Sequence, residues 1–183
     1  MRRHIVVTDY QPLWEQQFEM IAAMVRRILG DNCVAIHHIG STSVKGLSAK
    51  PTIDVLPVVK RIEAVDGCQA CFEAEGFEYL GEYGITGRRY LRQVVGEDDK
   101  AHLHIFSENS QMVIIRHLAV RDYLRQHYAE AEAYAALKKE LAMHYPYDVE
   151  GYCDGKDAFV QALERRALAW YKNEQKKGGK KIE

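Results

Sequence analysis

Apolar side chains at helical spacing predict the first element of the chain. Five of them recur at intervals of four, three, four and three residues: Trp14, Phe18, Ile21, Val25 and Ile28. This spacing places them on one face of an α-helix. Pro12 suits the first turn of such a helix, and Gly30 suits its end. The pattern therefore predicts a helix between these two residues, with one buried face.

Shorter apolar runs predict the strands. Residues 33–39 and 51–59 read as two buried strands, and Pro57 predicts that the second strand ends there or lies at a sheet edge. A helical pattern over 62–74 stops at Gly76. Residues 77–83 read as a short strand. Residues 88–95 and 102–107 then read as a hairpin around an acidic turn.

Beyond residue 110 the pattern is helical, with expected helices over 111–127, 129–144 and 156–172. The order of elements predicts an α+β fold, in which a mixed β-sheet is flanked by helices and followed by a helical C-terminal extension. No linker is apparent, so we expect a single domain over 1–172. Its sheet-containing core would span 1–108 and its helical part 109–172. Residues 173–183 are polar and broken by glycine, which predicts a flexible tail.

Composition narrows the class of protein. The 183 residues are 47% hydrophobic and 28% charged, which suits a folded core. A formal net charge of −1 gives no general electrostatic attraction to nucleic acid. No apolar run has the length of a membrane span, and the N-terminus lacks the features of a signal peptide. With only four cysteines, the chain is expected to be cytoplasmic, with no membrane partner.

The first candidate site is the turn Gly40-Ser41-Thr42, which directly follows the first predicted strand. A strand that ends in a Gly-Ser turn can direct backbone N–H groups and a hydroxyl at an anion, and glycine permits close approach. The turn therefore predicts a phosphate site. The alternative is a simple strand-to-helix turn, in which Ser41 or Thr42 caps the next helix.

A second candidate is Asp54, an acid within the apolar run of the next predicted strand. Burying an unpaired carboxylate is costly, so Asp54 requires a partner. A divalent cation would serve, and so would an ion pair with a nearby Lys or Arg. His102 and His104 alternate with Leu103 and share one face of their strand.

These residues predict a metal site formed by Asp54, His102 and His104, with His38 as a further candidate ligand. Mg²⁺ or Mn²⁺ would suit phosphate chemistry, whereas imidazole ligands favour Zn²⁺, Mn²⁺ or Ni²⁺. The alternative is that the histidines are ordinary polar or hydrogen-bonded residues of the sheet.

Cationic residues complete the candidate phosphate site. Lys50 precedes Pro51, so it is held extended at the entrance of its strand and could reach a phosphate. Arg88 and Arg89 begin a strand after a glycine-flanked loop, and alternation sends only one of them toward the site. Arg121 and Arg125 share a face of a later helix, where they could clamp a ligand or simply lie in solvent.

The residues around these candidates resemble those of a known family. The string HIGSTSVKGLSAKPTIDV, followed by RRYL, HLHIF, RDYLR and YAALKKELA, is similar to the GrpB family of bacterial proteins over about residues 5–170. This family is placed in the nucleotidyltransferase superfamily, whose hallmark is a Gly-Ser turn followed by an Asp-x-Asp strand. The resemblance implies a nucleotidyltransferase-like fold that binds a nucleoside triphosphate at the turn and could transfer a nucleotidyl group to an unknown acceptor.

The chain departs from the superfamily pattern at one acid. Asp54 stands alone, because Thr52 occupies one flanking acid position and Leu56 the other. Two-metal phosphoryl transfer uses acidic ligands for both cations. The expectations are therefore a transferase in which Asp54 and His104 are catalytic, an inactive nucleotide- and metal-binding module, or a metal-dependent hydrolase that uses Asp54, His102 and His104. No organic cofactor is expected.

Overall fold

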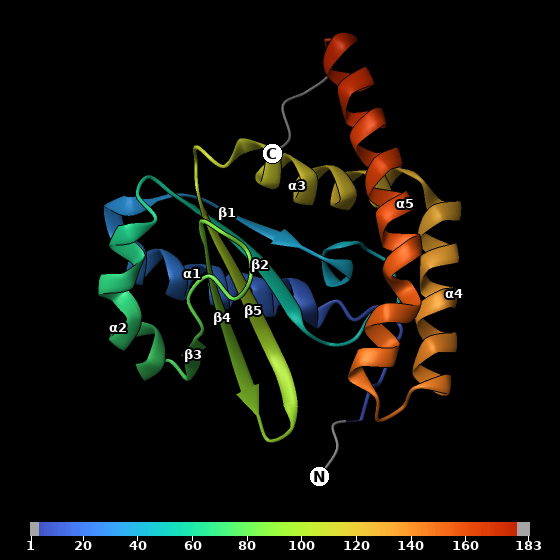
Figure 1. The fold of residues 1–183 in the computed structure, drawn as a ribbon, viewed down its shortest axis with the longest axis horizontal. Helices are drawn as coiled ribbons and strands as arrows, with labels where there is room; N and C mark the ends of the chain where they lie inside the picture. The colour runs from blue at the N-terminus through green and yellow to red at the C-terminus, as the bar shows by residue number, and fades with distance from the viewer. Residues whose placement is uncertain (1–3, 179–183) are drawn as a thin grey trace.

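The computed structural model describes residues 4–178, which form a five-stranded sheet with helices on both faces and at one end (Figure 1). In chain order the elements are α1 Leu13–Leu29, η1 Gly30–Asn32, β1 Cys33–Ile39, η2 Ser41–Ser43, β2 Ile53–Val59, η3 Glu63–Cys68, α2 Gln69–Ala74, β3 Phe77–Tyr79, β4 Arg88–Val95, β5 Asp98–Ser107, α3 Gln111–Gln126, α4 Tyr128–His144 and α5 Val149–Lys176, where η denotes a 3₁₀ helix. No helix within 4–178 is both long and apolar enough to cross a bilayer.

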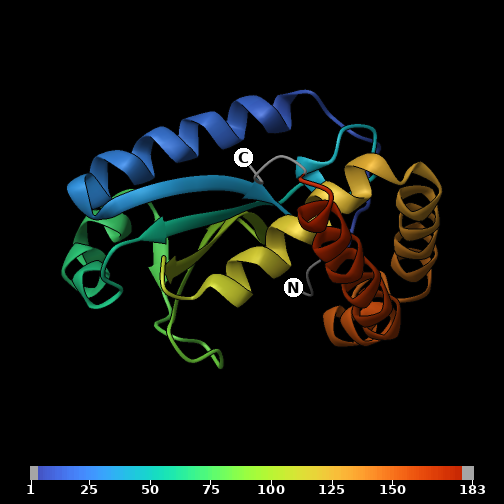
Figure 2. The same cartoon turned by 90° about the horizontal axis from the view of Figure 1, so that it is seen from above.

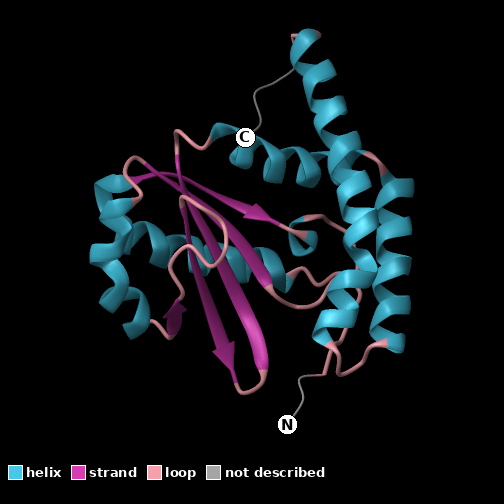
Figure 3. Ribbon diagram, in the orientation of Figure 1, coloured by secondary structure: helices cyan, strands magenta, loops and turns pink. Residues whose placement is uncertain are grey.

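The sheet is mixed, with the strand order β1-β2-β5-β4-β3 (Figure 3). Only β2 and β5 run parallel, and the other neighbours are antiparallel. The parallel register places Asp54 of β2 directly beside His102 of β5. The mixed sheet, its flanking helices and the helical C-terminal part confirm the predicted α+β fold.

Helices cover the two faces of the sheet separately, with α1 on one side and α3 on the other (Figure 2). The α1 side contains the main core, where Trp14 and Val25 pack with Val55 and Leu103. On the α3 side, Leu118 packs in a smaller cluster of which these sheet residues are part: Ile39, Leu56, Val58 and Phe106. Alternation along β2 and β5 therefore directs Asp54, His102 and His104 toward the α3 side.

The last two helices pack at one end of the sheet and hold the loop that follows β1. Val44 and Leu47 of this loop are buried against a cluster of α3, α4 and α5 that includes Tyr123 and Leu163. Near the N-terminus, Ile5 packs with residues of α4 and α5. The sheet part and the helical part therefore share buried surface.

Two strand predictions need correction. The β2 strand continues through Pro57 and lies between β1 and β5, so Pro57 is not at an edge. The parallel register with β5 includes Val55 and Val58 but skips Leu56 and Pro57, so the amide that proline lacks is not needed on that side. The predicted strand over 77–83 ends at Tyr79.

Two helix predictions also change. The segment over 62–74 is helical, but its first half is the 3₁₀ helix η3. The last helix begins at Val149 rather than at residue 156, because the Asp148 carboxylate accepts a hydrogen bond from Gly151 N and caps it. Residues 173–176 of the predicted tail belong to α5, and residues 179–183 lie outside the described part of the chain.

Candidate functional site

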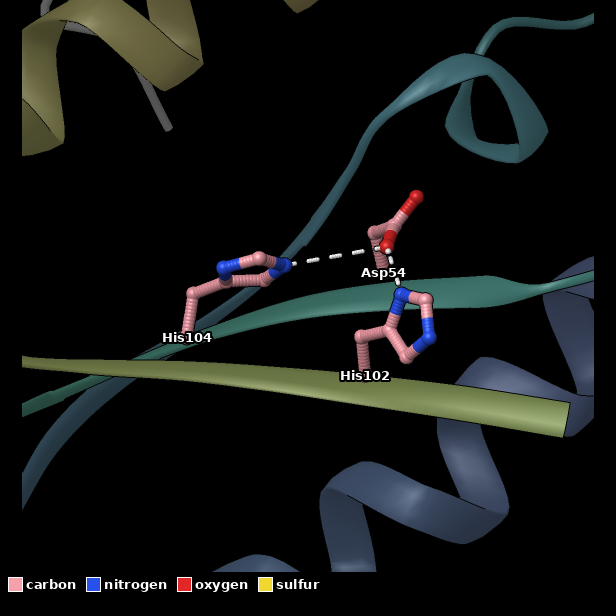
Figure 4. Close-up of side chains that lie close together, drawn as sticks. All are labelled: Asp54, His102 and His104. Atoms are coloured by element: carbon pink, nitrogen blue, oxygen red, sulfur yellow. Dashed lines mark hydrogen bonds and ion pairs between the residues drawn. The ribbon is translucent and has the colours of Figure 1, made fainter. Parts of the chain in front are cut away.

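The centre of the candidate site is a carboxylate with two imidazoles beside it. Asp54 Oδ1 lies 3.1 Å from His102 Nδ1 and 3.7 Å from His104 Nε2 (Figure 4). One ligand atom from each of the three residues lies within 4.8 Å of the others, which is close enough for all three to hold one metal ion. The parallel pairing of β2 and β5 brings together residues that are far apart in the sequence.

The imidazoles set the charge of Asp54. Burial by itself would raise the pKa of this carboxyl group, but the hydrogen bonds and charges of His102 and His104 outweigh burial and hold the pKa well below its usual range. The site therefore contains a carboxylate, which is the form that can bind a cation.

A second acid, Asp99, lies beside the ring nitrogen of His102 that faces away from Asp54. His102 Nε2 lies 3.0 Å from Asp99 Oδ2, which is an ion-pair distance, although the pair does not meet hydrogen-bond geometry. Lys50 Nζ lies 3.5 Å from the same oxygen, and the Thr52 hydroxyl donates to the backbone oxygen of Asp99. Lys50 therefore contacts an acid in this structure, and it also lines the cavity described below, so its contact with a phosphate stays a prediction. The Thr52 hydroxyl is engaged by a backbone oxygen.

The turn after β1 meets the carboxylate directly. Gly40 has φ +69°, and a Cβ built there would lie 2.5 Å from Asp54 Oδ2. No side chain fits between the two, so glycine is required both by the backbone angle and by the close approach. The Ser43 hydroxyl donates to the Gly40 carbonyl at 2.6 Å and closes the turn. The predicted phosphate turn and the predicted metal ligand Asp54 are therefore in direct contact.

A cavity of about 530 Å³ opens beside these residues. Gly40, Ser41, Asp54 and His102 line its sheet side, and residues of α4 and α5 line the opposite side. His104 is not among the lining residues. Its ring lies beside the half-buried ring of His117 on α3, with centroids 5.9 Å apart. Burial lowers the pKa of His117 to about 3, so this neighbour is neutral at physiological pH.

Lys138 of α4 is a residue of the cavity that was not predicted. It is buried, donates hydrogen bonds to Ser41 Oγ at 2.9 Å and to Ser48 O at 2.5 Å, and lies 4.4 Å above the Tyr134 ring. Burial, together with the nearby charge of Lys156, lowers the pKa of Lys138 to about 7. The sequence carries a signal for it, since Lys138 interrupts an apolar helical stripe formed by Ala131, Tyr134 and Leu141.

The two predicted arginines of β4 point to opposite faces. Arg88 lies on the α3 side of the sheet, the face that carries Asp54, but its guanidinium donates to the Glu82 and Tyr83 carbonyls. Arg89 pairs with Asp66 and lies on the α1 side, since its register partner Ile105 belongs to the core there. The structure does not bring Arg89 to the cavity, because alternation sends its side chain away.

Other candidates serve the surroundings of the turn. His38 lies on the α1 side, stacks on Phe18 and hydrogen-bonds to Thr42, so it is not placed with the metal ligands. Thr42 is buried, and its hydroxyl donates to the Thr52 carbonyl. Arg125 donates twice to the Ser43 carbonyl, at 2.8 and 3.1 Å, and so holds the turn rather than lining the cavity.

A protein-family model described as GrpB protein matches residues 4–166. The chain belongs to the GrpB family. UPF0157 protein YqkA of Bacillus subtilis is 38% identical over 178 residues, which are 97% of this chain and 51% of YqkA. UPF0157 protein BH1888 of Halalkalibacterium halodurans is 34% identical over 165 residues, which are 90% of this chain and 83% of that protein. The chain thus spans about half the length of YqkA and most of BH1888.

Solved structures agree with this membership. The crystal structure of conserved protein GrpB from Enterococcus faecalis is 47% identical, has a TM-score of 0.88, and is matched over 91% of this chain and 99% of its own. The structure of Cid1 in complex with its short product ApU is 14% identical, with a TM-score of 0.51 over 81% of this chain and 46% of Cid1. This second likeness shows the fold alone. The GrpB-family chain therefore has a nucleotidyltransferase-like fold.

Proposed function

We propose that this chain binds a nucleoside triphosphate together with a divalent cation in the 530 Å³ cavity, and transfers a nucleotidyl group to an acceptor. The observation that carries the proposal is the contact between the Gly40 turn and the Asp54 carboxylate. A phosphate turn and a cation ligand at van der Waals contact suit a ligand whose phosphates bind both.

The donor set of the proposed cation is Asp54, His102 and His104. Two imidazoles and one carboxylate favour Mn²⁺, Zn²⁺ or Ni²⁺ over Mg²⁺, which prefers oxygen ligands. The Asp99 carboxylate, 3.0 Å from His102 Nε2, would favour a proton on that nitrogen once a cation occupies Nδ1. Because His102 lines the cavity and His104 does not, we place His104 in the cation shell rather than in contact with an acceptor.

The phosphates would lie between this set and α4. Lys138 is already a hydrogen-bond donor to Ser41 Oγ, so a phosphate at the turn would meet an ammonium group in a poorly hydrated place, where charge-assisted hydrogen bonds are strong. A bound cation would stabilise the charge that develops on the transferring phosphoryl group. The protein itself would orient the phosphates and exclude water.

The lone acid supports a second candidate, a module that binds nucleotide without turnover. Asp54 is the one acid of β2, and the Thr52 hydroxyl that precedes the strand donates to a backbone carbonyl. A metal-dependent hydrolase built on the Asp54-His-His set is a third candidate.

Isothermal titration with ATP and UTP, with and without Mn²⁺, Mg²⁺ or Zn²⁺, separates these functions. Cation-dependent nucleotide binding with pyrophosphate release in the presence of an acceptor supports the transferase. Binding without release supports the module. Tight Zn²⁺ or Ni²⁺ binding without nucleotide affinity supports the hydrolase. The absence of both nucleotide and cation binding would refute the proposal.

Asp54→Asn should weaken Mn²⁺ binding and cation-dependent nucleotide binding at least about tenfold, because it removes the anionic ligand while it keeps the shape. His102→Ala should reduce cation affinity more than His104→Ala, since His102 lies closer to Asp54 and lines the cavity. Asp66→Asn is a matched control, because Asp66 is an acid paired with Arg89 on the other face. Unfolding of the Asp54 variant, with no metal bound by the wild type, would make Asp54 a structural partner only.

A further inference from the structure

The loop between β3 and β4, residues 80–87, lies across the face of the sheet that carries Asp54. It crosses the strands in the view of Figure 3, and in Figure 2 it extends from the sheet on the α3 side. Gly81, Gly84 and Gly87 all have positive φ, which gives the loop its tight course. The loop brings Tyr83 to the wall of the cavity.

Tyr83 has an unusual backbone conformation and an exposed ring. Its φ is +44°, and among residues 4–178 it is the only residue other than glycine with a positive φ. Such a conformation is unfavourable for a residue with a Cβ atom. The side chain is large and apolar, yet the residue is 59% exposed.

The inner face of the Tyr83 ring is supported and its other face is open. The ring stacks on Tyr90, with centroids 5.1 Å apart and planes 16° from parallel. Tyr90 is buried and lies beside the rings of His102 and His104. A row of ring contacts, tilted at the two histidines and stacked at Tyr83, thus connects the candidate cation ligands to an exposed ring on the cavity wall.

Arg88 holds this arrangement in place. Its guanidinium lies 4.8 Å from the centre of the Tyr90 ring and donates to Tyr83 O at 2.6 Å and to Glu82 O at 3.2 Å. The Glu82 carboxylate accepts from Gly87 N at 2.7 Å and closes the loop. A buried cation that fixes two consecutive loop carbonyls defines where the Tyr83 ring lies.

We propose that Tyr83 is the ring-binding residue of the cavity, and that a nucleobase stacks on its open face while the phosphates lie near Ser41 and Lys138. This inference rests on the proposed function and specifies its substrate class. Stacking on a tyrosine uses the π-face that every base has. The cavity therefore accepts purine and pyrimidine nucleotides alike, and purines bind more tightly because they overlap more of the ring.

The test compares ligands with and without a ring, in the presence of Mn²⁺: ATP, UTP and inorganic tripolyphosphate. Tyr83→Asn removes the ring but keeps a residue that tolerates positive φ. It should weaken ATP and UTP binding by about 5- to 150-fold, the range expected for the loss of one stacked base, and leave tripolyphosphate binding within about twofold. Tyr83→Phe should bind all three ligands nearly as the wild type does.

Tyr128→Ala is the matched control, since Tyr128 is 74% exposed and is not among the residues that line this cavity. It should change no affinity. Equal losses for nucleotides and tripolyphosphate in Tyr83→Asn, or no loss at all, would overturn the role of Tyr83 and leave the proposed function standing. A wild-type protein that binds none of the three ligands would overturn both.

Arg88→Lys distinguishes a positioning residue from a phosphate ligand. If Arg88 acts by fixing the loop, the variant should lose affinity for ATP and UTP and keep its affinity for tripolyphosphate, because lysine cannot reproduce the forked contact to two carbonyls. Loss of tripolyphosphate affinity as well would show that Arg88 binds phosphate itself, and would overturn its positioning role.

Discussion

At the scale of single residues, the site depends on Gly40. The turn after β1 and the strand β2 approach so closely that the space between Gly40 and the Asp54 carboxylate is smaller than a methyl group. The usual explanation of a glycine in a phosphate turn is access for the ligand. In this chain the structure gives a different reason, which is access for the Asp54 carboxylate of the neighbouring strand, and the sequence did not reveal it.

Gly40→Ala should therefore lower both the free energy of unfolding and the affinity for Mn²⁺. Gly46→Ala is the matched control, because Gly46 also has positive φ, +84°, but has nothing within 4 Å of an added Cβ. The control should lose about 1–2 kcal/mol of unfolding free energy, because alanine is strained at a positive φ. Gly40→Ala should lose at least about 1 kcal/mol more, since the Asp54 carboxylate must move. Urea unfolding and Mn²⁺ titration measure the two effects. Equal stability losses would show that the contact with Asp54 carries no cost.

At the scale of elements, regular apolar patterns in the sequence predicted helices and strands most accurately. The apolar stripe of α1 and the buried runs of β1 and β2 are regular, and these elements formed within a few residues of the prediction. One difference has a long-range cause, since the pairing of β2 with β5 skips Pro57. The other has a local cause, since the Asp148 carboxylate caps α5 and starts it early. Lys138 was missed because its role depends on which face of α4 meets the turn, and only the packing of α4 decides that.

α4 thus supplies a cation whose charge depends on pH. The pKa of Lys138 is about 7 in the folded protein and about 10.5 in the unfolded chain. Between these values the unfolded chain holds a proton that the folded chain does not, so this residue makes the free energy of unfolding rise with pH from about 7 to about 10.5. Lys138→Met should flatten this rise in urea unfolding. An unchanged pH profile would show that Lys138 keeps its proton in the folded protein.

Triphosphate binding should reverse the deprotonation, since a bound polyanion favours the charged form. At about pH 8.5, ATP binding with Mn²⁺ should take up nearly one proton in the wild type and none at this position in Lys138→Met, whose affinity should fall about 10- to 150-fold. Titration in buffers of different ionisation enthalpy counts the protons. Proton uptake that is identical in the two proteins would place the phosphates away from Lys138.

At the scale of the whole molecule, the sheet part and the helical part are expected to behave as one unit. Val44 and Leu47 of the loop after β1 are buried among the helices, Arg125 of α3 holds the Ser43 carbonyl, and Ile5 N donates to Pro146 O. The single domain that the sequence predicted is consistent with this shared packing, because neither part could be removed without exposing apolar surface of the other.

The two tryptophans of the chain provide a test, since Trp14 is buried under the sheet and Trp170 lies in the helical cluster. Trp14→Phe and Trp170→Phe each leave one fluorescent reporter. In each variant, the fluorescence midpoint in urea should coincide with the midpoint followed by circular dichroism, as two-state unfolding requires. A fluorescence transition that precedes or follows the loss of helix in either variant would show two independently folding parts.

The single parallel pairing of the sheet has a wider consequence. Asp54 and His102 are 48 positions apart, and they become neighbours only when β5 docks beside β2. Contacts of such separation form late, after the entropy of closing the intervening segment has been lost. The proposed cation binding therefore requires the complete sheet, and a Mn²⁺ titration would report whether β5 has paired with β2.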